Sequence, residues 1–284
     1  MAPEKNKSTP GQSGLTPKQL AEQARAESEA AERRRERTIR IVGGLVVLLV
    51  VGGLLAAGFF AGRDTGTDGS ASSAPTPDPG AASPAGVGAS FGVPYGAGWT
   101  SADEAKLPTL EIWEDFQCPA CKQVEEASGA QIQALADAGK VKLLYRPATF
   151  LDASLAADNQ ANGNPNSSAR STSAWGCAVD AGKTGEYHNA VFDIQPADEG
   201  VGFSDQQLID LGTTVGIDGA DLATYTTCVQ DGTYLSWSAN SNQEFVTAGV
   251  GGTPTAYLNG VELNGSDLAD IEGLTQKIEA ATAQ

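Results

Sequence analysis

Two cysteines separated by two residues, Cys118 and Cys121, are the most chemically informative residues of this chain. At the start of a helix, residues three apart lie one turn from each other on the same face, so their sulfurs can close a small disulfide ring. Pro119 suits this place, because proline has no N–H to lose in a first helical turn. The unpaired N–H groups and positive dipole end of such a helix favour a thiolate at Cys118. A low-pKa thiolate is a good leaving group, so the oxidised pair is suited to pass its disulfide to another thiol.

The segments around the cysteine pair predict a mixed α/β order. The apolar run Thr109–Glu114 predicts a strand just before the cysteines, and the pattern from Cys118 to Ala138 predicts a helix. Val141–Tyr145 predicts a second strand. Near the end of the chain, the Asn-Gly dipeptide at 259–260 separates two short apolar runs and predicts a hairpin, which a closing helix follows.

Between the second strand and the hairpin lies a long stretch, about residues 152–249, whose helical patterns are interrupted by glycines. The helices that it predicts are Thr172–Val179, Glu186–Ile194, Asp205–Thr214, Leu222–Gln230 and Tyr234–Thr247. This order of elements predicts an α/β fold in which a helical insertion separates two halves of one sheet.

Composition divides the chain into four segments. Residues 1–40 are charged, whereas residues 41–62 carry no charge over 22 residues. At ~1.5 Å per residue a helix of that length spans roughly 33 Å, enough to cross a bilayer core. Residues 63–90 are mostly Gly, Ala, Ser, Thr, Pro and Asp, which predicts a flexible, disordered tether. Residues 91–284 have the size of one domain with a sizeable core.

An arginine cluster predicts the orientation of the apolar segment. It lies directly before that segment and consists of Arg33, Arg34, Arg35, Arg37 and Arg40. The positive-inside rule then places residues 1–40 in the cytoplasm and everything after Gly62 outside, in a single-pass protein of the cell membrane. A cleaved signal peptide is the alternative, but it would need a shorter charged region and a shorter apolar stretch.

The net charge excludes one class of partner. The whole chain carries −17, and residues 1–40 carry +3 from nine Lys/Arg and six Glu, which leaves −20 for the remainder. Nucleic acid is bound through Lys and Arg, so this acidic exterior argues against it as a partner. All four cysteines fall in the part expected outside the membrane, where disulfides persist.

Two motifs together resemble a known family. Trp113–Cys121 reads WEDFQCPAC, and Gly251–Thr255 follows about 130 residues later as GGTPT. This combination resembles the DsbA-like thiol–disulfide oxidoreductases of the thioredoxin superfamily, in particular the membrane-tethered type of high-GC Gram-positive bacteria. The resemblance covers residues 91–284 and implies a thioredoxin-like fold with a helical insertion in an extracytoplasmic domain. A lone CxxC would be less specific, because zinc sites and electron-transfer proteins share it.

The resemblance implies a role for each residue of the site. Cys118 matches the exposed nucleophile that forms a mixed disulfide with the substrate, and Cys121 matches its shielded resolving partner. Pro254 matches a proline that is cis and faces the disulfide, and the adjacent Thr253 hydroxyl would donate to the thiolate. An ordinary proline at the entry to a strand is the alternative for Pro254. Strongly oxidising relatives carry a histidine where this chain has Ala120, so we expect a less oxidising disulfide.

The proton acceptor for Cys121 is left open by the sequence. Many relatives place a buried glutamate six residues before the first cysteine, a position that Ile112 occupies here. Glu111 and Glu114 flank it. Either carboxylate, or a water molecule, is a candidate to take the Cys121 proton.

The second cysteine pair has a different expected role. Four cysteines allow three pairings, and keeping the CPxC pair together leaves Cys177 with Cys228, 51 residues apart. This pair also resembles the extra bridge of actinobacterial relatives. A disulfide that closes a loop of that length stabilises the folded state by roughly 4 kcal/mol at most. Two free buried thiols are the alternative. A zinc site needs two close-spaced ligand pairs, and only one CxxC is present, so no metal is expected.

Two further features suggest chemistry but are given a plainer interpretation. His188, the only histidine, lies in a predicted helix and could act as an acid or base, yet we expect it at the surface. The glycine run at 249–252 lacks the preceding strand and following helix of a nucleotide site. No organic cofactor is expected.

Together these features predict a thiol oxidase that donates disulfides to reduced secreted proteins as they fold. A membrane partner of the quinone-linked type that reoxidises the cysteine pair is implied by the resemblance alone. We expect a monomer, because no dimerisation domain is visible. The alternatives are a thiol reductase or isomerase of the same fold, and a non-catalytic tethered binding module whose CxxC disulfide is structural.

Overall fold

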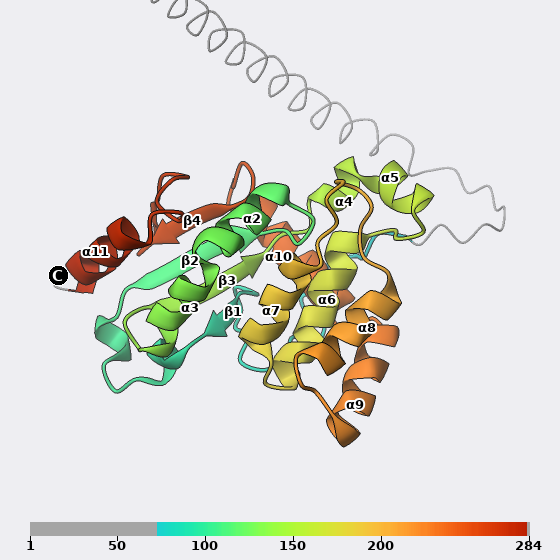
Figure 1. Ribbon diagram of the computed structural model, residues 1–284, viewed down its shortest axis with the longest axis horizontal. Coiled ribbons are helices and arrows are strands. Elements are labelled where there is room, and N and C mark those ends of the chain that lie inside the picture. Colours follow the sequence, from blue (N-terminus) through green and yellow to red (C-terminus); the bar gives the residue numbers. More distant parts are fainter. Residues whose placement is uncertain (1–72, 283–284) are drawn as a thin grey trace, which may run out of the picture. The chain divides into compact units, whose positions relative to one another are not determined.

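A five-stranded sheet forms the centre of the protein. The computed structural model describes residues 73–282, and the account below concerns this part of the chain (Figure 1). In the order β1-β3-β2-β4-β5, only β2 and β3 are parallel neighbours. The strands are β1 (Val93–Tyr95), β2 (Thr109–Glu114), β3 (Lys142–Pro147), β4 (Thr255–Leu258) and β5 (Val261–Glu262). This mixed sheet confirms the predicted α/β class.

The strands near the cysteines lie where the sequence predicts them. β2 has the predicted bounds, whereas β3 begins one residue later and ends two residues later than predicted. The hairpin between β4 and β5 turns at Asn259 and Gly260, with φ of 51° and 77°. Asn-Gly is the dipeptide that tolerates these left-handed conformations, so the hairpin prediction is confirmed.

Alternation along β2 decides which side chains face the core. Leu110 and Ile112 are fully buried on one face, and Glu114, two residues further, follows the same alternation. Glu111 is only half-buried and, by the same period of two, belongs to the opposite face. β2 therefore carries one carboxylate into the interior at its C-terminal end.

One long helical segment follows the cysteines, as predicted, but it contains an irregular turn. It consists of α2 (Pro119–Val124), the π-helical η3 (Glu125–Gly129) and α3 (Ala130–Asp137). The π turn adds a residue and rotates the helix, so Ala127, which a regular helix would bury, is exposed. Ser128 is buried in its place. Gly139 ends the segment with φ of 64°.

The helical insertion stands beside the sheet. Figure 1 shows α6, α7, α8 and α9 gathered there, while α2 and α3 lie across one face of the sheet. The five predicted helices are all present, and α4 and α5 were not predicted. The insertion contains α4 (Leu151–Ser154), α5 (Ala156–Ala161), α6 (Ser167–Asp180), α7 (Thr184–Asp193), α8 (Asp205–Thr214), α9 (Gly219–Gln230) and α10 (Leu235–Thr247). α11 (Ile271–Thr282) closes the chain.

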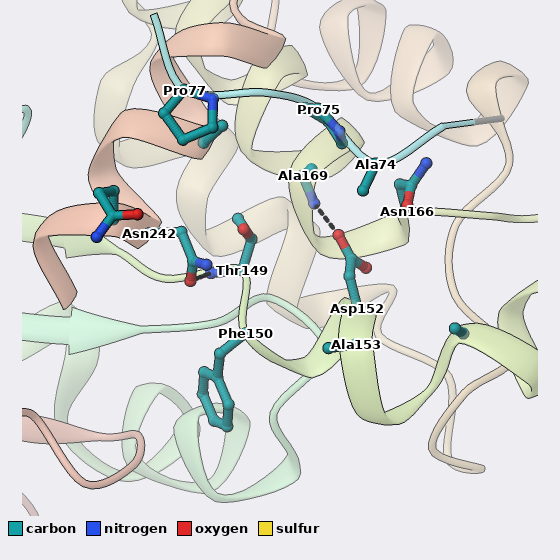
Figure 2. Close-up of a pocket in the computed structure, with 13 residues that line it drawn as sticks. Ala74, Pro75, Pro77, Thr149, Phe150, Asp152, Ala153, Asn166, Ala169 and Asn242 are labelled. Atoms are coloured by element: carbon teal, nitrogen blue, oxygen red, sulfur yellow. Dashed lines mark hydrogen bonds between the residues drawn. The ribbon is translucent and has the colours of Figure 1, made fainter. Parts of the chain in front are cut away.

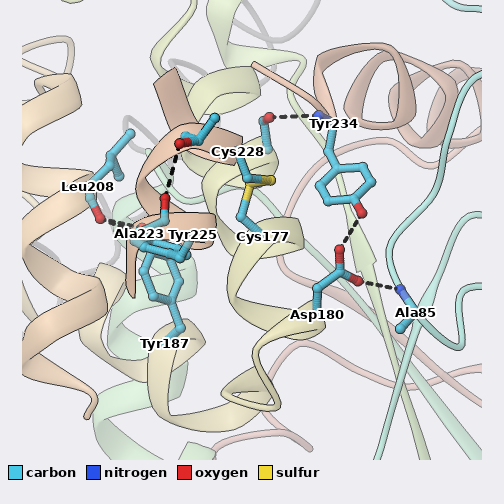
Figure 3. The surroundings of a disulfide bond; sticks show 11 residues. Ala85, Cys177, Asp180, Tyr187, Leu208, Ala223, Tyr225, Cys228 and Tyr234 are labelled. Atoms are coloured by element: carbon cyan, nitrogen blue, oxygen red, sulfur yellow. Dashed lines mark hydrogen bonds between the residues drawn. A yellow bond between two sulfur atoms is a disulfide. The ribbon is translucent and has the colours of Figure 1, made fainter. Parts of the chain in front are cut away.

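A disulfide joins two helices of the insertion. Cys177 on α6 and Cys228 on α9 are bonded at 2.03 Å, with their Cα atoms 5.9 Å apart (Figure 3). Close by, the hydroxyls of Tyr187 and Tyr225 both donate to the Leu208 carbonyl, at 2.8 and 2.6 Å. The bridge ties α6 to α9 beside these tyrosines, and both of its cysteines also line a cavity of about 180 Å³.

Part of the predicted tether lies on the domain. The sequence predicts a flexible tether over residues 63–90, and this prediction is wrong for residues 73–90. These residues pass over α6 and α10. The Asn240 amide donates to the Asp78 carbonyl at 2.7 Å, and the Ala85 N–H donates to Asp180 at 2.8 Å. Pro84 is buried against Gly176, which has no side chain to exclude it. Backbone hydrogen bonds and small contacts order this segment despite its lack of large apolar side chains.

The start of the described chain borders a pocket. Ala74, Pro75 and Pro77 line one side of this cavity of about 450 Å³, opposite Thr149 and Asp152 (Figure 2). The domain therefore begins by residue 73 rather than at residue 91. The predicted membrane segment, residues 41–62, lies outside the described residues, and none of the helices within them is long and apolar enough to cross a membrane.

Candidate active site at the cysteine pair

The two cysteines occupy the start of α2. Cys118 is the N-cap residue, Pro119 follows at the first helical position, and both cysteines are free thiols in the structure. Cys121 is fully buried, and Cys118 keeps 7% of its surface exposed. Cys118 is thus the more accessible sulfur, but it is less exposed than the resemblance implies. The reason is the loop before β4, which places the Thr253 carbonyl 3.3 Å from the Cys118 sulfur.

The surroundings of the two sulfurs separate their acidities. The pKa of Cys118 is lowered to about 6, chiefly by a hydrogen bond from the Cys121 thiol, and further by Thr253 and the backbone N–H groups of Cys121 and Ala120. Burial opposes this shift but is outweighed. The pKa of Cys121 is raised well above its usual value, first by burial. Near neutral pH, Cys118 is therefore mainly a thiolate and Cys121 a thiol.

The proline loop faces this thiolate. The Thr253–Pro254 peptide bond is cis, as the resemblance implies. When it is protonated, the Cys118 thiol donates to the main-chain carbonyl of Thr253. The hydroxyl is buried and has no partner among the described residues, so it is free to donate once Cys118 is ionised. Pro254 has no N–H and leaves the neighbouring backbone open to an extended peptide.

A polar network fixes the loop that leads into the cysteines. The Gln117 amide donates to Ser168 at 2.8 Å, to Asp152 at 3.1 Å and to Asn159 at 3.2 Å. Asp152 in turn accepts from two N–H groups at the start of α6, one of them that of Ala169 (Figure 2). The residue next to Cys118 is therefore fastened to the helical insertion, which holds the N-terminus of α2 in place.

The structure distinguishes between the two proposed proton acceptors. Glu114 is 6% exposed, and its charge raises the pKa of Cys121. Glu111 lies near Arg146 instead, at 3.9 Å between the carboxylate and Nε, and its side chain is 29% exposed. Glu111 does not join the cysteine site, because the alternation of β2 directs it to the other face.

The expectation of a surface histidine is wrong. His188 is 1% exposed, and its Nε2 lies 3.0 Å from Oε2 of Glu114. Burial lowers its pKa, so it is neutral at pH 7. The cause of this position is the packing of α7 against the site, where four aromatic rings surround the imidazole: Phe116, Tyr145, Trp175 and Phe192.

A third titratable residue belongs to this group and was not predicted. Glu125, on the π turn, places Oε2 3.8 Å from Nδ1 of His188. Burial raises the pKa of Glu125 to about 8, and burial likewise raises that of Glu114 to about 8. The sequence contained one signal for Glu125: it is four residues after Cys121 and so lies on the same helix face. No sequence pattern indicated His188, whose place depends on tertiary packing.

This group is also the one set of described residues with the geometry of a metal site. One ligand atom each of Glu114, Glu125 and His188 lies within 4.8 Å of the others. The set offers three ligands, which is fewer than the four of a structural zinc site and equal to the number that the protein supplies in a catalytic one. The adjacent space among Glu114, His188 and aromatic side chains is about 10 Å³, about the volume that a single water molecule needs.

Comparison with known proteins agrees with this geometry. A thioredoxin family model, Thioredoxin_4, matches residues 102–280, more than half of the chain. The chain belongs to this family. Among solved structures, oxidised DsbA of Mycobacterium tuberculosis is similar at 27% identity with a TM-score of 0.50, over 68% of this chain and 98% of that one. A comparison with curated proteins found no match.

Two further structures support the fold. MdbA of Actinomyces oris, a thiol–disulfide oxidoreductase, has 21% identity and a TM-score of 0.54, over 67% of this chain and 88% of that one. BdbD of Bacillus subtilis has 20% identity and a TM-score of 0.51, over 72% of this chain and 98% of that one. The chain is thus a DsbA-like member of the thioredoxin superfamily and a protein thiol–disulfide oxidoreductase.

Proposed function

We propose that this protein is a membrane-anchored extracytoplasmic oxidase that donates the Cys118–Cys121 disulfide to secreted proteins during folding. One observation carries the proposal: the pKa of Cys118 is lowered to about 6, while that of Cys121 is raised. A stabilised Cys118 thiolate favours the reduced form of the pair. The oxidised form is therefore a ready donor of its disulfide.

The proposed reaction has two thiol–disulfide exchange steps. A substrate thiolate attacks the Cys118 sulfur, the Cys118–Cys121 bond breaks, and Cys121 leaves with the electron pair and takes a proton from Glu114. The thiolate of a second substrate cysteine then attacks the first substrate cysteine's sulfur in the mixed disulfide, which breaks its bond to Cys118 and releases Cys118 as a thiolate. The substrate loses two electrons and gains a disulfide, and the enzyme is left with two reduced cysteines.

The cis-proline loop suits an unfolded substrate. An extended peptide can pair with the backbone beside Pro254 through main-chain hydrogen bonds, which do not depend on its sequence. Such binding would place a substrate cysteine next to the Cys118 sulfur, which lies 3.3 Å from the Thr253 carbonyl. Because the backbone is recognised and not the side chains, the enzyme would accept many different secreted proteins as substrates.

Anchoring and reoxidation complete the proposal. The uncharged residues 41–62 and the arginines before them support a single membrane span, with the cysteines outside. Oxidation of substrates leaves the pair reduced, so a partner must accept two electrons for each turnover. We propose a membrane reoxidase as this partner and a monomer as the working form.

The experiment is oxidation of a reduced, unfolded protein by the purified full-length chain. We expect the oxidised wild type to introduce disulfides stoichiometrically. Cys118→Ala should introduce none, and Cys177→Ser combined with Cys228→Ser should remain active. Protease treatment of intact cells should digest the part after Gly62 and spare residues 1–40. A protein that only reduces disulfides under these conditions would support the reductase alternative instead.

A further inference from the structure

Gln195 is a buried residue that takes no part in the exchange steps but contacts the turn in front of the active cysteines. It lies just after α7 and is 7% exposed. Its side-chain amide donates to the Phe116 carbonyl at 2.7 Å and to the Cys118 carbonyl at 3.1 Å. One buried amide thus spans two main-chain carbonyls, on either side of Gln117. A buried carbonyl without a donor is costly, so these bonds fix the course of the backbone in this turn.

The contact also runs in the opposite direction. Lys122, on α2, places its ammonium group 3.2 Å from the Gln195 carbonyl and 3.4 Å from the Asp193 carbonyl. These carbonyls lie at the end of α7, where main-chain acceptors lack helical partners and a positive charge is favourable. Gln195 therefore binds the chain that enters α2, and Lys122 binds the chain that leaves α7. We call these two residues the α2–α7 clamp.

The clamp acts on Cys118 because of the place of this residue in the helix. Cys118 is the N-cap of α2, and its carbonyl accepts the first helical hydrogen bond, from the Lys122 N–H at 3.2 Å. Its own N–H donates to the Asp115 carbonyl at 2.8 Å. With Gln195 as a second donor, both lone pairs of the Cys118 carbonyl are engaged, which prevents rotation of the peptide that follows. This geometry keeps the sulfur at the start of the helical segment, where a thiolate is stabilised.

We propose that Gln195 is a positioning residue for disulfide exchange, which together with Lys122 holds Cys118 in its N-cap position. The inference deepens the proposed function and rests on it. Gln195 acts through the main chain of Cys118 and not on a sulfur atom. Loss of its amide should free the turn, weaken the stabilisation of the Cys118 thiolate and shift the cysteine pair toward its disulfide form. The protein would then be a weaker oxidant.

The test is the equilibrium of the full-length protein with a glutathione buffer, followed by alkylation of Cys118 and mass spectrometry. Two molecules of glutathione reduce the Cys118–Cys121 disulfide and leave as one oxidised glutathione, so the equilibrium constant reports how far the protein stabilises its reduced pair. Gln195→Met keeps the length of the side chain without an N–H and should lower this constant about tenfold, which corresponds to ~30 mV. Gln195→Glu should lower it further, because a carboxylate would face the same two carbonyls.

Gln133 supplies the matched control. It is a second glutamine that is 7% exposed, and its amide donates to the Tyr145 hydroxyl at 3.0 Å and to the Asn189 side chain at 2.8 Å. Gln133→Met should lower the free energy of unfolding, as the loss of buried hydrogen bonds does, and leave the glutathione constant at its wild-type value. A constant that is unchanged in folded Gln195→Met, or lowered equally in Gln133→Met, would overturn the inference.

Lys122 tests the clamp from its other side, on a side chain that is 25% exposed. Lys122→Met should lower the constant severalfold in the wild type but much less in Gln195→Met, because Lys122 acts through the position of Gln195. Equal effects in both backgrounds would contradict the clamp, since the lysine would then act independently. If Gln195→Met does not fold, an unchanged constant in Lys122→Met overturns the inference. The proposed function would fail differently, with the wild type itself unable to oxidise a reduced protein.

Discussion

The protein contains two cysteine pairs that differ in almost every physical respect. Cys118 and Cys121 are three residues apart at a helix N-terminus, where hydrogen bonds lower the pKa of one sulfur and burial raises that of the other. Cys177 and Cys228 are 51 residues apart and join the C-terminal part of α6 to that of α9. In the proposed function, the same side chain serves exchange in one place and stability in the other. The surroundings, and not the cysteines themselves, decide the role.

The largest expected effect is the loss of exchange at the first pair. Cys118→Ala should abolish disulfide donation and trap no substrate, because no nucleophilic sulfur remains accessible. Cys121→Ala should trap mixed disulfides with secreted proteins, because the resolving thiol is missing. Nonreducing electrophoresis of cells that express each variant measures this difference. Equal trapping by both variants would contradict the division of roles.

Removal of the second pair should affect stability and spare activity. Cys177→Ser with Cys228→Ser should lower the free energy of unfolding by a few kcal/mol, up to the ~4 kcal/mol of the chain-entropy model. Denaturant unfolding measures this change, and oxidase activity at low temperature should stay nearly intact. A folded double mutant without activity would show that the second pair exchanges electrons with the first.

Glu114 should make the stability of the protein depend on pH. Its folded pKa of about 8 lies above the ordinary value of 4.5, so the folded state holds a proton that the unfolded state releases. Stability from this proton is present below about pH 4.5 and is lost as the pH rises through 8. Glu114→Gln should therefore lose less stability than the wild type between pH 5 and pH 8, with Glu111→Gln as the control. Parallel unfolding curves for wild type and Glu114→Gln would contradict this prediction.

The smallest predicted effect concerns the residue between the active cysteines. Histidine at position 120 would add a donor, partly charged, near the Cys118 thiolate. Since Cys121, Thr253 and the backbone already stabilise that thiolate, the gain should be partial. Ala120→His should make the disulfide more oxidising by tens of millivolts, where ~30 mV corresponds to ~1.4 kcal/mol. Equilibration with glutathione measures it, and a shift in the other direction would contradict the argument.

The sequence predicted the fold and the position of a cysteine pair at a helix N-terminus because both depend on local patterns. Strand β2, the start of α2 and the Asn-Gly hairpin each follow from residue types within a few positions. Alternation along β2 could also have favoured Glu114 over Glu111, because Glu114 is two residues after the buried Ile112. That signal was available in the sequence alone.

Other features depended on contacts between distant segments. His188 lies in the core because α7 packs against α6, α8 and the π turn η3, and nothing near position 188 indicates this. The π turn at Glu125–Gly129 has no simple sequence signature, so the exposure of Ala127 was not predictable. Residues 73–90 looked like a tether by composition, yet their backbone groups bond to Asp180 and Asn240. Composition describes what a segment can bury, but not which partners order its backbone.

The account is tested most directly by titrating the thiolate of the reduced full-length protein. Ultraviolet thiolate absorbance, followed against pH, should show one transition with a midpoint of about 6 that is absent from Cys118→Ala. The Cys121 thiol should ionise only at much higher pH. A single transition near the free-thiol value of about 8.5 would contradict the claim that the protein stabilises a Cys118 thiolate to donate its disulfide.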